Sequence, residues 1–117
     1  MTEPKIAKIV NESGEISDDL DYALANFLLA QRGAGFTACR PQLVELEDQT
    51  QAIKMMIDHT YIGKDNNVYG LGIVGYIYIS TTDYSIIFCT PLGEMEVNIQ
   101  VLKDSGVEAQ VRPKGKY

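Results

Sequence analysis

The chain has 117 residues, of which 45% are hydrophobic and 22% charged, which is typical of one globular domain and excludes an intrinsically disordered chain. Sixteen acidic residues against ten basic ones give a formal net charge of −6, which disfavours nucleic-acid binding because the phosphate backbone is repelled. The longest apolar run, residues 73–79, is far shorter than the roughly 20 residues of a membrane helix, and the N-terminus has no secretory pattern, so we expect a cytoplasmic protein with no membrane partner.

The first third of the chain predicts a short strand followed by a helix. Residues 5–10 are consistent with a strand, and turn-forming residues follow them. Ser17 is a good N-cap, acidic residues occupy the next positions, and apolar residues then recur with a period near 3.6 until Gly33 stops the pattern. We therefore expect a helix at residues 17–32, within an N-terminal extension that spans residues 1–35.

The next segment predicts a strand and a second helix. Residues 36–46 have an extended pattern, and Pro41 places this strand at an edge or at a bulge. Asp48 is a suitable cap for a helix that ends near His59. The apolar side of that helix would consist of Leu46, Ile53, Met56 and Ile57.

The C-terminal part predicts a hairpin, a helix and a final strand. Residues 68–80 and 84–89 are rich in β-branched and aromatic side chains and are separated by a short polar turn. Thr90 followed by Pro91 is typical of a helix start, because threonine can cap a free amide and proline is favoured in the first turn. Residues 107–112 alternate between apolar and polar and predict a half-exposed strand.

This order of elements predicts a single α+β domain over residues 1–117. From residue 36 to residue 113 the order is strand, helix, strand, strand, helix, strand, which matches a ferredoxin-like βαββαβ fold with an antiparallel sheet and two helices on one face. The N-terminal helix would be an addition to that core. Another α+β two-layer sandwich is the alternative.

Residues 70–75 (GLGIVG) match the G-x-G-x-x-G pattern of dinucleotide-binding loops. That loop needs a helix after the glycines, whereas a strand follows here, so the match does not predict nucleotide binding. Gly70, Gly72 and Gly75 are instead expected to bend the strand, host a bulge, or allow a close approach by another backbone or a ligand.

No residue pattern predicts a catalytic or metal site, and we expect no cofactor. His59 is the one histidine in the sequence, which excludes a site with several histidines from one chain. Cys39 and Cys89 lie far apart and are expected to be buried free thiols, although a disulfide stays open. A minimal enzyme would have to use Asp58, His59 or Tyr61.

Three tyrosines are candidate binding residues. Tyr76, Tyr78 and Tyr84 are expected to form an aromatic patch on the sheet face opposite the isoleucines. Such a patch is typical of an interface anchor, but the same pattern also fits a core position beneath the N-terminal helix.

The first functional hypothesis is therefore a non-enzymatic interaction or regulatory module, most simply a homodimer joined through the long strand or the N-terminal helix. The alternative is a sensor resembling ACT-type domains, which would hold a small metabolite near Gly70, Gly72 and Gly75. The minimal enzyme is the second alternative. The candidate partners are thus a second copy, another protein or a small metabolite.

Overall fold

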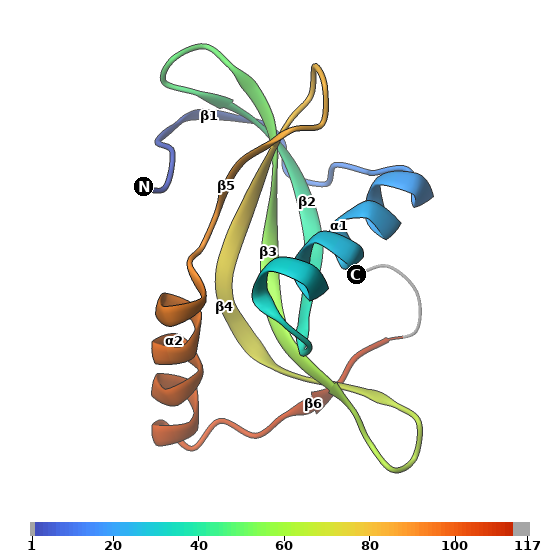
Figure 1. Cartoon of the computed structure of the whole chain (residues 1–117). Coiled ribbons are helices and arrows are strands. Elements are labelled where there is room, and N and C mark those ends of the chain that lie inside the picture. The colour runs from blue at the N-terminus through green and yellow to red at the C-terminus, as the bar shows by residue number, and fades with distance from the viewer. Residues whose placement is uncertain (1, 114–117) are drawn as a thin grey trace.

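The computed structural model describes residues 2–113, which contain one antiparallel sheet of six strands and two helices (Figure 1). The strands are β1 (Ile6–Asn11), β2 (Phe36–Leu46), β3 (Gln51–Ile62), β4 (Val68–Ser80), β5 (Ile86–Cys89) and β6 (Gln110–Val111). The helices are α1 (Asp18–Arg32) and α2 (Leu92–Asp104). Neither helix has the length and apolar character that crossing a membrane requires.

The sheet follows the chain order. Strands β1, β2, β3, β4 and β5 each pair antiparallel with the next, and β6 pairs with the opposite end of β4. The helix α1 is inserted between β1 and β2 rather than between two strands of a βαβ unit. The α+β class is confirmed, but the ferredoxin-like βαββαβ order is wrong.

The error lies at residues 51–62, which form the central strand β3 and not a helix. Ile53, Met56 and Ile57 have helical spacing, but Ile53, Met55 and Ile57 also have the two-residue period of a strand. The strand prevails because β2 and β4 pair with it along both edges and satisfy its backbone groups.

The expected cap of that helix forms a turn instead. Asp48 accepts a hydrogen bond from the backbone N–H of Thr50 at 3.0 Å, and Gln49 has a φ of 72°. This is an Asx-type turn, which reverses the chain between β2 and β3. The same aspartate chemistry that can begin a helix here closes a hairpin.

The first helix is confirmed. Ser17 caps it by accepting a hydrogen bond from the N–H of Leu20 at 3.2 Å, and Gly33 ends it with a φ of 99°. Arg32, in its last turn, donates from Nε to the carbonyl oxygen of Thr90 at 2.9 Å. The C-terminal end of α1 is thereby fixed to the start of α2.

Both helices contribute to the main hydrophobic core, which lies on one face of the sheet (Figure 1). Helix α1 crosses the sheet near β2, and α2 lies beside β4. The buried members of this core are Leu20, Leu24, Leu28, Met55, Ile57, Val74, Ile77, Ile79, Cys89 and Met95. The helices are thus held by apolar burial against the strands, which is the dominant favourable term in folding.

A smaller core occupies the other face near β1. Its buried members are Val44, Leu46, Ala52, Tyr78 and Phe88, with Ile6 packed against them. The N-terminal segment closes this core, because the Tyr78 hydroxyl donates to Glu3 Oε2 at 2.7 Å. Two cores therefore lie on opposite faces of the strands, and the tyrosine is part of the second.

The glycines of β4 bend this strand, as the sequence predicted. Strand β4 contains one residue more than β3 between Gly75 and Ile73, and one more between Ile73 and Gly70. Gly72 lies between these points with a φ of 146°, a value that favours glycine. Two bulges therefore lie close together and curve the long strand.

The edge of β4 between β5 and β6 is closed by polar groups of the α2 region. The sequence predicted that Thr90 caps the helix α2, and this is wrong. Its Oγ1 instead accepts a hydrogen bond from the N–H of Tyr76 at 2.9 Å, and its own N–H donates to the Tyr76 carbonyl at 3.0 Å. The Asn98 side chain donates to the Val74 carbonyl at 2.9 Å. These bonds replace a neighbouring strand where none is present.

We predict that Gly75→Ala destabilises the protein by about 1–3 kcal/mol, the usual range for overpacking a core. A Cβ atom at this position would lie 2.8 Å from Thr90 Cβ and 3.1 Å from Met95 Sδ, so α2 would have to move. The matched control is Gly93→Ala in α2, where a Cβ meets nothing within 4 Å and alanine is the better helix former. Urea denaturation should separate the two variants, and equal midpoints would contradict the close approach of α2 to β4.

Candidate functional site

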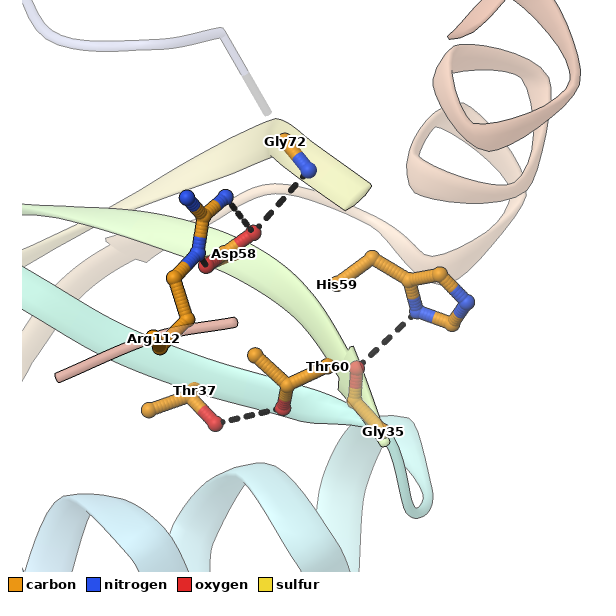
Figure 2. A network of polar contacts seen from close by, with 7 residues as sticks. All are labelled: Gly35, Thr37, Asp58, His59, Thr60, Gly72 and Arg112. Carbon is orange, nitrogen blue, oxygen red and sulfur yellow. Dashed lines mark hydrogen bonds and ion pairs between the residues drawn. The ribbon is translucent and has the colours of Figure 1, made fainter. Parts of the chain in front are cut away.

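The most unusual polar side chain is that of Asp58 in β3, which is 1% exposed. A buried carboxylate costs several kcal/mol unless a partner compensates its charge. Arg112 supplies that charge: its Nε donates to Asp58 Oδ2 at 2.8 Å, and its second contact to Oδ1 is 3.4 Å long. The backbone N–H of Gly72 donates to Oδ1 at 3.1 Å (Figure 2). Groups from β3, β4 and the end of β6 therefore meet at one carboxylate.

Gly70 makes this meeting possible. A Cβ atom built on Gly70 would overlap both Arg112 Nε and Asp58 Oδ2, so no larger residue leaves room for the pair. The backbone N–H of Arg112 also donates to the Val68 carbonyl at 2.8 Å, which places the guanidinium directly over β4. Of the three candidate glycines, Gly70 is the one that leaves space for charged side chains.

The space beside the other two glycines is filled by the chain itself. A Cβ atom on Gly72 would lie 3.2 Å from Leu102 Cδ1, and that on Gly75 would contact Thr90. All three candidate glycines thus face side chains of the same chain in this structure. A metabolite near them stays a prediction, and it would have to displace these groups.

The buried thiol of Cys39 responds to this cluster. Burial and, to a smaller extent, the negative charge of Asp58 raise the pKa of Cys39 from 9.0 to about 11, while Arg40 and Arg112 oppose the shift. A neutral, buried thiol is a poor nucleophile. We therefore regard Cys39 as structural.

The two cysteines are free in this structure and cannot reach one another. Cys39 lies on β2 and Cys89 on β5, with β3 and β4 between them. Three strand spacings amount to about 14 Å, roughly twice the Cα separation that a disulfide allows. The expected buried thiols are confirmed, and the alternative of a disulfide within the chain is not.

The residues proposed for a minimal enzyme do not converge. Asp58 and His59 are neighbours on one strand, and in Figure 2 their side chains point in different directions. His59 Nδ1 lies 2.9 Å from the Gly35 carbonyl oxygen. His59 is part of the strand β3, not of the end of a helix as expected. Tyr61 is 53% exposed and stacks on Tyr69 with ring centroids 5.4 Å apart. Within residues 2–113, no three potential metal ligands lie together.

The three candidate tyrosines do not lie in equivalent environments. Tyr78 is fully buried, and desolvation together with its bond to Glu3 raises its pKa. Tyr76 is half-buried, with Lys54 Nζ 4.3 Å above its ring. Tyr84 is 57% exposed in the turn between β4 and β5. Helix α1 covers the other face of the sheet, so it is not what buries Tyr78.

An open pocket of about 370 Å³ lies between the N-terminal segment, the turn after β2 and β5. The residues that line it are Thr2, Pro4, Lys5, Leu46, Glu47, Asp48 and Ile87. The backbone N–H of Thr50 lowers the pKa of Asp48, so this rim residue stays ionised. The pocket combines a small apolar floor with charges of both signs.

Strand β1 has an open edge. In the part of the chain that the structure describes, β1 pairs with β2 on one side and with no strand on the other. Five of its six residues are exposed, including Ile9 at 46% and Val10 at 44%. We use the name β1 edge segment for residues 8–12 (KIVNE), which are the last four residues of β1 and the first residue of the turn that follows; they carry these two apolar side chains between a lysine and a glutamate.

The sequence analysis predicted neither the pair of Asp58 and Arg112 nor the open edge of β1. Asp58 lies in the segment that was expected to form a helix, and no buried partner was expected for it, although it directly follows three apolar residues. Arg112 lies at the end of the expected half-exposed strand, and its contact with Asp58 was not predicted. The open edge of β1 had no sequence signal, because which strand lies at an edge depends on how the strands are ordered.

We predict that the free energy of unfolding falls as pH rises from about 9 to 11, in part because of Cys39. The unfolded thiol ionises near its ordinary value, whereas burial raises the folded pKa to about 11, so the stabilising contribution is full below pH 9 and is lost through pH 11. In Cys39→Ala this loss should be smaller. Urea denaturation at pH 8 and pH 10.5 measures it, and parallel profiles for the two proteins would refute the assignment.

No relative supplies an independent guide to these sites. Comparisons with protein-family models, curated proteins and solved structures find no match to this chain. The functional interpretation therefore depends on the chemistry of the described residues.

Proposed function

We propose that this chain is a non-enzymatic interaction module that forms a homodimer through antiparallel pairing of β1 with β1 of a second copy. The observation that carries the proposal is the open edge of β1, whose unpaired backbone groups are a template for another strand. Edge-to-edge pairing of two identical strands gives a closed twofold dimer.

The β1 edge segment is complementary to itself. In an antiparallel register centred on Val10, Lys8 of one copy lies opposite Glu12 of the other, and the two Val10 side chains are paired. Opposite charges directly across a strand pair stabilise it, as do paired β-branched residues. The twofold axis repeats the Lys8–Glu12 pair, so each dimer gains it twice.

The features that protect β1 against other strands also favour this partner. Strand β1 is irregular at two points in its pairing with β2, and Lys8 stands on the edge; both features discourage indiscriminate pairing. The charge of Lys8 is unfavourable beside a strand that offers no opposite charge. A strand with an acidic residue opposite Lys8 compensates this charge, and Glu12 of a second copy is such a residue. Specificity here arises from the lysine as much as from the apolar contacts.

The two dimer surfaces suggested by the sequence have less support. The long strand β4 has β3 on one side, and β5, β6 and the hydrogen bonds from Thr90 and Asn98 on the other. The apolar stripe of α1, made of Leu20, Leu24 and Leu28, is buried in the main core. Neither offers the free backbone groups that β1 does.

The metabolite sensor and the minimal enzyme also have less support. The ligand position expected beside the glycines is filled by side chains of the chain itself. Asp58, His59 and Tyr61 point to different surroundings and share no substrate position.

We predict that Lys8→Glu and Glu12→Lys each weaken the dimer about tenfold or more, because each replaces two attractive pairs by two repulsive ones. The double variant Lys8→Glu/Glu12→Lys should restore dimerisation. Size-exclusion chromatography with light scattering across a concentration series measures the effect.

Lys64→Glu and Glu96→Lys are matched controls, because they change the net charge equally at exposed positions away from β1. They should leave the dimer unchanged. A wild-type protein that stays monomeric at several hundred micromolar would end the proposal, and a double variant no better than the single ones would exclude this register.

A further inference from the structure

The pair of Asp58 and Arg112 has the geometry of a built receptor for one chemical group. We use the name guanidinium slot for the carboxylate of Asp58, the N–H of Gly72 that orients it, and the space above Gly70. The carboxylate is 1% exposed and reaches Arg112 Nε at 2.8 Å, while the arginine side chain keeps 22% of its surface exposed. The carboxylate of Asp58 is therefore buried, whereas the side chain of Arg112 is partly accessible to solvent.

We propose that this slot is a binding site for guanidino compounds, which Arg112 fills from the same chain and which an external small guanidinium ion fills when Arg112 is withdrawn. The proposal is independent of the dimer, because β1 and the slot involve different residues. The ligand class is an alkylguanidinium, not a general cation.

The selectivity follows from shape and hydrogen bonding. A guanidinium is planar and presents several N–H donors side by side, so it can contact both oxygens of one carboxylate. The plane passes over β4 where a Cβ atom on Gly70 would overlap it. An ammonium ion is a compact, strongly hydrated point charge, and burial of its charge costs more. The slot therefore favours guanidinium over ammonium of equal charge.

Arg112 is at the end of a short, largely exposed segment that follows α2. After α2, Gly106 has a φ of 75°, Val107 is 41% exposed, and β6 comprises two exposed residues that pair with β4. This segment carries Arg112 as a tethered ligand, whose effective concentration is at least of the order of millimolar, the value for a short flexible linker. In the wild type, an external guanidino compound can displace Arg112 only at concentrations above this effective concentration. Once Arg112 is removed, the compound binds without a competitor.

The test is chemical rescue of Arg112→Ala. This variant leaves Asp58 without its guanidinium, so its thermal midpoint should lie below that of the wild type. Methylguanidinium chloride, titrated to about 20 mM at constant ionic strength, should raise the midpoint of Arg112→Ala along a saturating curve. Methylammonium chloride should not, and the wild-type midpoint should change little. If Arg112→Ala is unfolded, recovery of its circular dichroism spectrum by methylguanidinium but not methylammonium gives the same answer.

The control variants locate the site. Arg112→Ala/Asp58→Asn removes the carboxylate, and Arg112→Ala/Gly70→Ala fills the space above the strand; neither should respond to methylguanidinium. An equal response to both cations, or rescue that persists in the Asp58→Asn background, would overturn the proposal. Neither result bears on β1 pairing, since light scattering reports that separately.

Discussion

The bend of β4 is the constraint on which the rest of the structure depends. Two extra residues and the glycines near them let a thirteen-residue strand curve instead of running straight. The curvature brings α2 close enough for Thr90 to bond the backbone of Tyr76 and for Met95 to enter the main core. The same strand receives the guanidinium over Gly70 at its other end. Glycine is required at these positions for room and backbone conformation, not for flexibility.

The buried carboxylate of Asp58 couples the centre of the sheet to the end of the described chain. An ionised carboxylate inside protein is tolerated only with a compensating charge and with hydrogen bonds for both oxygens. Arg112, directly after β6, and the N–H of Gly72 in β4 supply such a charge and such a hydrogen bond. The two-residue strand β6 is held beside β4 by its own backbone pairing and, directly after it, by this ion pair.

The dimer proposal and the guanidinium proposal depend on different polar groups, namely the outer edge of β1 and the carboxylate of Asp58. Thr90 and Asn98 close the gap in the edge of β4, whereas in the described structure β1 pairs with no strand on its outer side. Self-pairing would satisfy that edge, with Lys8 and Glu12 choosing the partner. The slot is satisfied within one chain by Arg112, whose backbone N–H also bonds to the Val68 carbonyl of β4. Assembly and ligand binding would thus be physically separate properties.

The sequence by itself determined the elements whose signals are local. The cap at Ser17, the 3.6-residue period and Gly33 define α1, and the β-rich tract with its polar turn defines the hairpin of β4 and β5. At residues 51–62 the apolar positions satisfy both a helical and a strand period, so only the neighbouring strands decided the outcome. The pair of Asp58 and Arg112 joins residues 54 positions apart, and the open edge of β1 follows from strand order. Contacts between distant segments depend on the whole chain's burial and pairing, which no local pattern records.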